Sequence, residues 1–238
     1  MRIAIVDCRI AAEVETSLGG YVDKIIKLPA YSRLAAPVAS HPDMLLWSRG
    51  DIIVTYRDYY DIAREQLREL ERMGYKTVFC DEIASEQYPS DVALNCALLG
   101  KHVIANTRHV SEKIRKIAAS GGLRLLHTNQ GYAKCSTVCV SDNALITSDA
   151  SIYKCAAQNG ISALRVRPDH VRLDGYGTGF LGGASGTTES EVLFCGNLDS
   201  HPDAESIRFF CAEHKRCAVS LGGGALYDYG TLMILSEI

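Results

Sequence analysis

Hydrophobic residues along the chain follow a pattern that recurs about every 45 residues. In each unit, two short apolar runs surround a polar turn, an amphipathic segment follows, and a glycine precedes one more apolar run. This order predicts a hairpin, then a helix, then a strand in every unit. The hairpins are predicted to start near residues 43, 91, 135, 180 and 225.

Helical spacing of apolar residues marks the segment after each hairpin. The clearest case is 59–73, where all but one of the residues on one face are apolar or aromatic and Asp58 is the predicted cap. Ser111 and Asp149 are predicted to begin the next two helices. Ser200 is predicted to begin the last one, with Pro202 in its first turn.

The two ends of the chain complement each other. Residues 2–7, 10–18 and 21–28 predict a strand, a helix and a strand with no full hairpin before them. The segments ALYD and TLMIL near the C-terminus predict a hairpin with no helix after it. Joining the ends completes a fifth ββαβ unit, so the sequence predicts a closed α/β ring. Two other folds explain the pattern less well. A WD40-type propeller has a similar period but no amphipathic helix in each blade, and a doubly wound Rossmann sheet has no hairpin in each unit.

The whole chain is therefore expected to be one domain of five modules. Their predicted limits are 41–80, 89–127, 132–166, 180–221, and 224–238 joined with 1–28.

The composition is that of an ordinary globular protein, with 238 residues, 47% hydrophobic, 22% charged and a net charge of −3. No apolar run approaches the roughly 18 residues of a membrane span. The start MRIAIVDCRI predicts a strand and not a signal peptide. The absence of a Lys/Arg block argues against a nucleic-acid partner. We therefore expect no membrane partner, and the missing secretion signal together with the odd number of cysteines predicts a cytoplasmic protein.

Nine cysteines are many for this length, and their number is odd. We expect reduced thiols, most of them buried. Cys135 and Cys139 form the one closely spaced pair, but four residues of a strand span about 13 Å, which is too far for a disulfide or a shared metal. No set of cysteines has zinc-finger spacing, so neither a metal nor another cofactor is predicted.

A ring of five ββαβ modules resembles the pentein superfamily. Its guanidine-modifying members include arginine deiminases, agmatine deiminases, dimethylarginine dimethylaminohydrolases and amidinotransferases. The resemblance covers the whole chain by module pattern and implies a five-bladed α/β propeller with pseudo-fivefold symmetry. Within the superfamily, the chain is similar to short proteins of unknown function that carry HPDM and GYxKC segments.

Two motifs carry the functional part of the resemblance. His41-Pro42-Asp43 resembles the H-x-D of the family's histidine module, and Gly131 to Cys135 resembles the Gly-x-x-x-Cys of its nucleophile module. The resemblance implies Cys135 as nucleophile, His41 as general base, and Asp43 and Asp228 as ligands of a cationic guanidino or amidino substrate. A thiolate attacks the guanidinium carbon, an imidazole moves protons, and carboxylates pair with the cation.

The chain also departs from the family pattern. The family's nucleophile is usually near the C-terminus, so this assignment implies a circular permutation. The C-terminal segment has Tyr227, Asp228 and Tyr229 but no cysteine. The fourth hairpin offers Gly183 and its neighbours where the family has an acid.

If the modules are related by rotation, the loops before the hairpins meet at one end of the axis. His41, Asp91, Cys135, Gly183 and Asp228 are then expected to converge on one pocket. Gln130, Tyr132 and Lys134 precede Cys135 and are also expected to bind substrate. The Lys134 ammonium is close enough in sequence to lower the pKa of the Cys135 thiol, although neighbours in a strand point to opposite faces.

Each of these signals has a structural alternative. Cys135 is one of nine cysteines, and the Ser-His-Pro-Asp segment before the first hairpin recurs at 200–203, where it predicts a helix start. The second functional hypothesis is therefore a non-catalytic ring that binds a metabolite or a macromolecule. In that case Tyr132 and the tyrosines around Asp228 would supply stacking and polar contacts.

Overall fold

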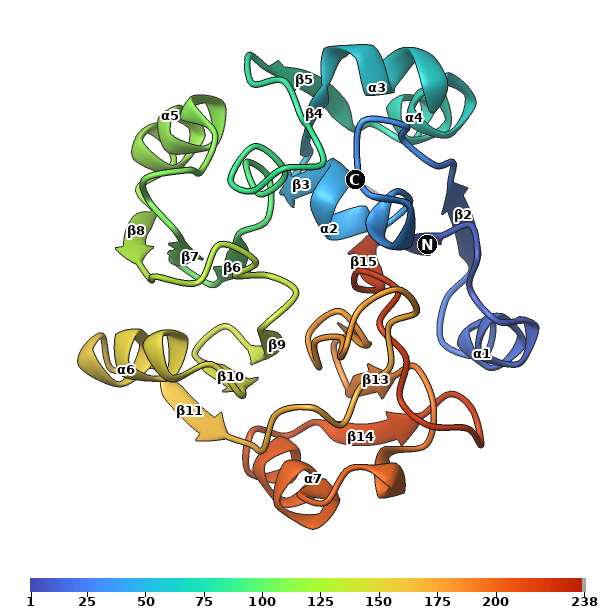
Figure 1. Cartoon of the computed structure of the whole chain (residues 1–238), viewed down its shortest axis with the longest axis vertical. Coiled ribbons are helices and arrows are strands. Elements are labelled where there is room, and N and C mark those ends of the chain that lie inside the picture. The colour runs from blue at the N-terminus through green and yellow to red at the C-terminus, as the bar shows by residue number, and fades with distance from the viewer. Residues whose placement is uncertain (237–238) are drawn as a thin grey trace.

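The computed structural model describes residues 1–236, which form five three-stranded sheets arranged in a ring (Figure 1). In every sheet the middle strand pairs antiparallel with one neighbour and parallel with the other. A helix joins the two parallel strands, as the hydrophobic pattern predicts. Helices α1, α4, α5, α6 and α7 lie on the rim of the ring in Figure 1.

The modules share one element order. The first module after the N-terminal segment contains β3 (Leu46–Arg49), β4 (Ile52–Tyr56), α3 (Arg57–Ile62), α4 (Arg64–Arg72) and β5 (Lys76–Cys80). The second contains β6 (Ala97–Leu99), β7 (His102–Ala105), α5 (Glu112–Ser120) and β8 (Arg124–His127). The third contains β9 (Val138–Ser141), β10 (Ala144–Thr147), α6 (Ala150–Gln158) and β11 (Ser162–Arg165). The fourth contains β12 (Ser185–Thr187), β13 (Glu191–Phe194), η2 (Leu198–Ser200), α7 (Ala204–Glu213) and β14 (Cys217–Ser220).

The chain ends together form the fifth module. It consists of β15 (Met233–Ser236), β1 (Arg2–Asp7), α1 (Ala12–Leu18) and β2 (Lys24–Leu28). β15 pairs antiparallel with β1, and β1 pairs parallel with β2, so the ring closes through the termini as predicted. The predicted C-terminal hairpin is wrong, however. The partner of β15 is β1, and Tyr227 of the ALYD segment bridges to Arg172.

Long-range contacts explain the differences in the helices. The predicted helix 59–73 is two helices that meet at Ala63, and Asp58 caps neither of them. Its carboxylate instead accepts hydrogen bonds from the Tyr31 hydroxyl (2.6 Å) and from Arg33 (2.7 Å). Ser111 and Asp149 do cap α5 and α6. Ser200 ends the η2 turn, and α7 begins only at Ala204.

One short turn bears directly on the site. Before β3, the sequence HPDML forms the helical turn α2 (Pro42–Leu45) in place of the first part of the predicted strand. Pro42 favours this turn because its fixed φ suits the first helical position, where its missing N–H is not needed. Short η1 (Ala36–Val38) lies in the loop that leads to it. Within residues 1–236, none of the helices has the length and apolar character needed to span a bilayer.

Candidate active site at the centre of the ring

The α2 turn places His41 and Asp43 against the C-terminal segment. The backbone N–H of Asp43 donates to the Gly230 carbonyl at 3.0 Å, and the Thr231 hydroxyl donates to Asp43 Oδ2 at 2.9 Å. Gly230 has φ 68°, and a Cβ built there would overlap the His41 side chain. Glycine is therefore required both by the backbone conformation and by the close approach of the two segments.

The carboxylate of Asp228 is buried. Its oxygens accept hydrogen bonds from the backbone N–H of Phe180 (2.8 Å) and of Gly230 (2.9 Å). Burial raises the pKa of Asp228, although the nearby His41 opposes this shift. A Cβ on Gly183 would overlap this carboxylate, so the predicted site residue Gly183 contributes space and backbone contacts. Its N–H donates to the Cys135 carbonyl at 2.8 Å.

The imidazole of His41 lies between two buried carboxylates. Its Nε2 is 3.8 Å from Asp7 Oδ2, and its Nδ1 is 3.8 Å from Asp228 Oδ1. These distances are too long for hydrogen bonds, and neither ring nitrogen has a hydrogen-bond partner among the described residues. Asp7 itself is held by Arg9, whose Nε and Nη2 donate to its two oxygens at 2.9 and 2.5 Å.

The thiol of Cys135 is buried close to the carboxylates of Asp43 and Asp228. Burial raises its pKa well above the ordinary value, and the charges of Asp43 and Asp228 raise it further. The side-chain amide of Asn95 donates to the sulfur at 3.0 Å and opposes that rise. The expected lowering of the Cys135 pKa by Lys134 is therefore not found. Residues 131–137 form turns and not a strand, and Lys134 extends away toward Cys139, where its charge lowers the thiol pKa against a larger effect of burial.

Asn95 connects three modules through its side chain. Its Oδ1 accepts the backbone N–H groups of Lys134 (2.8 Å) and Cys135 (3.2 Å). Its Nδ2 donates to the Asp43 carbonyl (3.2 Å) as well as to the Cys135 sulfur. Because Oδ1 must face two donors, the orientation of the amide is fixed, and its NH₂ group faces the Asp43 carbonyl and the Cys135 sulfur.

Sequence reasoning missed Asp7, Asn95 and Thr231. The available signal was position relative to the inner strands, by which we mean β3, β6, β9, β12 and β15. Two or three residues before four of these strands lie Asp43, Asn95, Cys135 and Thr231. Aligning the modules on the inner strands, and not on the starts of the apolar runs, would have placed these four polar side chains at one level of the ring.

The remaining predicted residues divide into two groups. Tyr132 donates its hydroxyl to Asp91 Oδ2 at 2.5 Å and stacks on Phe180, with ring centroids 6.0 Å apart. Burial raises the pKa of Asp91. Gln130 donates to Asp149 at 3.2 Å. The structure thus brings together His41, Asp43, Cys135, Gly183 and Asp228. Asp91, which was expected in the same pocket, is hydrogen-bonded to Tyr132 instead, and Gln130 is hydrogen-bonded to Asp149.

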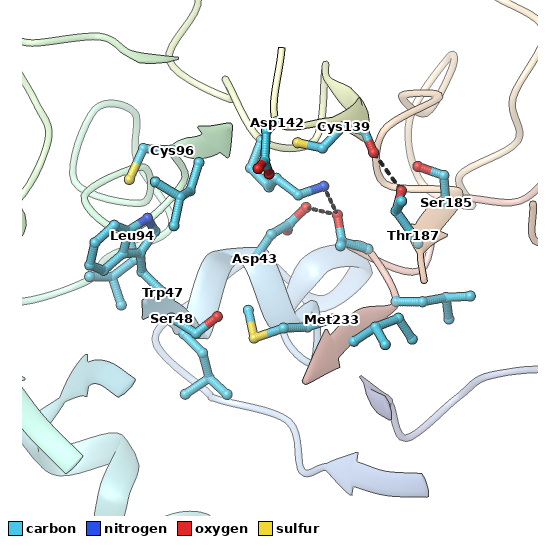
Figure 2. A pocket seen from close by; sticks show the side chains of 17 residues that line it. Asp43, Trp47, Ser48, Leu94, Cys96, Cys139, Asp142, Ser185, Thr187 and Met233 are labelled. Atoms are coloured by element: carbon cyan, nitrogen blue, oxygen red, sulfur yellow. Dashed lines mark hydrogen bonds between the residues drawn. The ribbon is translucent and has the colours of Figure 1, made fainter. Parts of the chain in front are cut away.

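Two cavities approach this cluster from different sides. The first, which we call the axial channel, has a volume of ≈ 380 Å³ (Figure 2). It is lined by residues of β3, β6, β9, β12 and β15, and by Asp43, Lys134 and Thr231, which precede three of these strands. The second, the loop-side pocket, has a volume of ≈ 400 Å³ and is lined by Asp7, Arg9, Pro37, Asp174 and 227–229. The cluster of thiol, imidazole and carboxylates lies between them. Within residues 1–236, no three His, Cys, Asp or Glu side chains are grouped to hold a metal ion.

Five three-stranded sheets around a common axis are the architecture of the penteins. Solved structures with the same fold confirm this assignment. An amidinotransferase of saxitoxin biosynthesis from Microseira wollei has a TM-score of 0.59 at 11% identity, over 95% of this chain and 80% of that one. DDAH from Pseudomonas aeruginosa, complexed with citrulline, has a TM-score of 0.56 at 12% identity, over 92% and 90%. Agmatine deiminase from C. jejuni has a TM-score of 0.55 at 8% identity, over 93% and 86%.

Identities this low establish the fold alone. The chain belongs to DUF6873, a family of unknown function, whose model matches residues 5–233. No curated protein matches the chain.

Proposed function

We propose that this protein is a cysteine-dependent hydrolase or transferase that acts on a small guanidino or amidino compound. The observation that carries the proposal is the buried cluster at the ring centre, where the Cys135 thiol lies close to the carboxylates of Asp43 and Asp228. Cys135 is the nucleophile, His41 moves protons, and the two aspartates bind the cationic group. The names of the structural neighbours, an amidinotransferase and an agmatine deiminase, support the same chemistry.

The electrostatics of the site favour a cationic ligand. Without one, burial and two carboxylates keep the thiol of Cys135 protonated. An amidinium or guanidinium ion between the carboxylates offsets their charge, so the pKa of the thiol falls when the ligand binds. The thiol passes its proton to His41, and the thiolate attacks the central carbon and forms a C–S bond. The amine that leaves with the electrons of the broken C–N bond takes a proton from His41, whose ring nitrogens have no other partner among residues 1–236. After the amine has left, water in a hydrolase or an acceptor amine in a transferase attacks the same carbon and releases the Cys135 sulfur.

One observation favours the alternative of a non-catalytic binding protein. Cys135 lines neither of the two cavities that approach the cluster, and its thiol is buried. In this alternative the carboxylates hold a cation and the thiol only packs. Such a protein would be stabilised against heat by its ligand without converting it.

The proposal is tested with two alkylating agents of the same shape, the cationic 2-chloroacetamidine and the neutral 2-chloroacetamide. Each leaves the same thioether linkage on the thiol and releases chloride. Two carboxylates that each contribute about 1 kcal/mol of attraction favour the cation at Cys135 by roughly ten-fold or more. Peptide mass spectrometry gives the rate at each cysteine, and the exposed Cys8 and Cys217 supply the intrinsic ratio of the two reagents.

We expect the cation preference at Cys135 to exceed that at Cys8, and to fall in Asp228→Asn. An equal preference at all cysteines, or no reaction at Cys135 with either reagent, contradicts the enzymatic proposal. Incubation with arginine and agmatine, followed by detection of a ureido product or a transferred amidino group, tests turnover directly. Cys135→Ala is expected to abolish it, whereas Cys155→Ala, a substitution on α6, is expected to retain it.

A further inference from the structure

The axial channel is a cavity in its own right on the side of the cluster away from Asp7. It runs between the inner strands and shares Leu98, Cys139 and Asp142 with a neighbouring hollow of ≈ 260 Å³. That hollow is also lined by Glu189, in the turn between β12 and β13, and by Ser141, the last residue of β9, so the channel opens at the hairpin-turn end of the ring. The loop-side pocket shares none of these residues.

Two opposite charges lie at the inner end of the channel. The Lys134 ammonium donates to the Thr231 hydroxyl at 2.9 Å, and the same hydroxyl donates to Asp43 Oδ2 at 2.9 Å. Figure 2 shows Asp43 pointing toward the middle of the channel, with Cys139 and Asp142 on the opposite side. Asp43 Oδ1 is buried and accepts no N–H or O–H hydrogen bond from residues 1–236, and the Cys135 thiol is a weak donor beside this carboxylate. A buried carboxylate oxygen without a donor is costly, and a donor from a ligand or water would remove that cost.

Lys134 and Cys139 both line the axial channel. Lys134 is the charged group that acts on the Cys139 sulfur. The remaining polar contacts of the ammonium are the Thr231 hydroxyl and the Thr137 carbonyl at 3.4 Å, neither of which carries a charge. Lys134 therefore has no carboxylate within salt-bridge distance in the described part of the chain, and its charge is available to a ligand.

We propose that the axial channel binds a compact zwitterion, whose acidic group is received by Lys134 and whose amino or amidino group donates to Asp43. The two protein charges are separated by a single hydroxyl group, so the opposite charges of the ligand must also be only a few bonds apart. A small amino acid or amidino acid meets this condition. The inference goes beyond the proposed function, because binding at Lys134 does not require Cys135 to react.

The test uses Cys139 as a reporter inside the channel. Two methanethiosulfonates of similar size, one with a sulfonate group and one with a trimethylammonium group, each form a mixed disulfide with a thiol and release methanesulfinate. Their rates at Cys139 are measured by peptide mass spectrometry and divided by their rates at the exposed Cys8 and Cys217. One nearby unit charge is worth about 1 kcal/mol even in bulk water, so the sulfonate reagent is expected to be favoured roughly five-fold at Cys139.

Variants assign that preference to one side chain. Lys134→Gln is expected to abolish the preference, Lys134→Arg to keep it, and Lys101→Gln, in a hairpin turn of another module, to leave it unchanged. The ratio of the two reagents cancels any general change in the reactivity of the thiol. Should Lys134→Gln fail to fold, the ratios in the wild-type protein and in Lys134→Arg still decide the question.

Three results would overturn the proposal. The first is a sulfonate preference at Cys139 no larger than that at Cys8, and the second is a preference that persists in Lys134→Gln. The third is an unlabelled Cys139 in a protein whose Cys8 and Cys217 are labelled, because the channel would then be closed. None of these results depends on Cys135, so failure here is distinguishable from failure of the proposed enzymatic function.

Discussion

Replacement of Asn95 by alanine tests whether one side chain holds the central cluster together. The side chain is 1% exposed and accepts the backbone N–H groups of Lys134 and Cys135. Alanine leaves both donors without an acceptor, and it also frees the Asp43 carbonyl. Local turns cannot supply a substitute, because the hydrogen bonds within the Cys135 segment begin at the N–H groups of Ser136 and Thr137.

The magnitude follows from these contacts. A buried donor that loses its acceptor costs about 1–3 kcal/mol, and two N–H groups lose their acceptor here. Allowing for partial relaxation, the expected loss is about 3 kcal/mol in the free energy of unfolding. It is measured from the urea midpoint and slope at neutral pH. Asn159→Ala is the matched control, because Asn159 also makes side-chain hydrogen bonds but lies only half-buried at the end of α6. A loss for Asn95→Ala no larger than that of Asn159→Ala would refute the reasoning.

Two further predictions concern pH and ring closure. Burial raises the pKa of folded Asp228, so its stabilising contribution is full below the ordinary carboxyl pKa of about 3.9 and is lost as pH rises through the raised value. Asp228→Asn is expected to flatten the fall of the urea midpoint above about pH 4; an unchanged pH profile would contradict this. Deletion of the chain from Met233 onward removes the β15 partner of β1 and is expected to abolish cooperative unfolding in circular dichroism, whereas retention of a sharp transition would show that the ring need not close.

The ring was predictable because its modules repeat one hydrophobic pattern. Each helix must bury an apolar face against its own sheet, and this local requirement is visible in the sequence. The features that were mispredicted depend on partners far away in the chain. Asp58 has the residue type of a cap, but Tyr31 and Arg33 bind its carboxylate. The C-terminal strand has an apparent partner in ALYD, but β1 takes that place.

The meeting of His41 and Cys135 at the ring centre was predictable because a family motif marks each of them, and their roles stay predictions. The site was not predictable at Asp7 or Asn95, because each is a single polar residue whose role exists only after the modules meet. The possible effect of Lys134 on the pKa of Cys135 is not found, and its predicted part in substrate binding stays a prediction. The argument from alternating strand faces does not apply to a segment of turns, and only the folded chain shows that its ammonium faces Cys139.

The protonated state of Cys135 has a consequence for the survival of the protein in an oxidising cell. Peroxides attack thiolates and not thiols, so a thiol that two carboxylates and complete burial keep neutral is a poor target. The exposed Cys8 and Cys217 are open to such damage, but neither belongs to the central cluster. If Cys135 is the nucleophile that we propose, the same electrostatics that protect its thiol from peroxide would restrict its reactivity to cationic compounds.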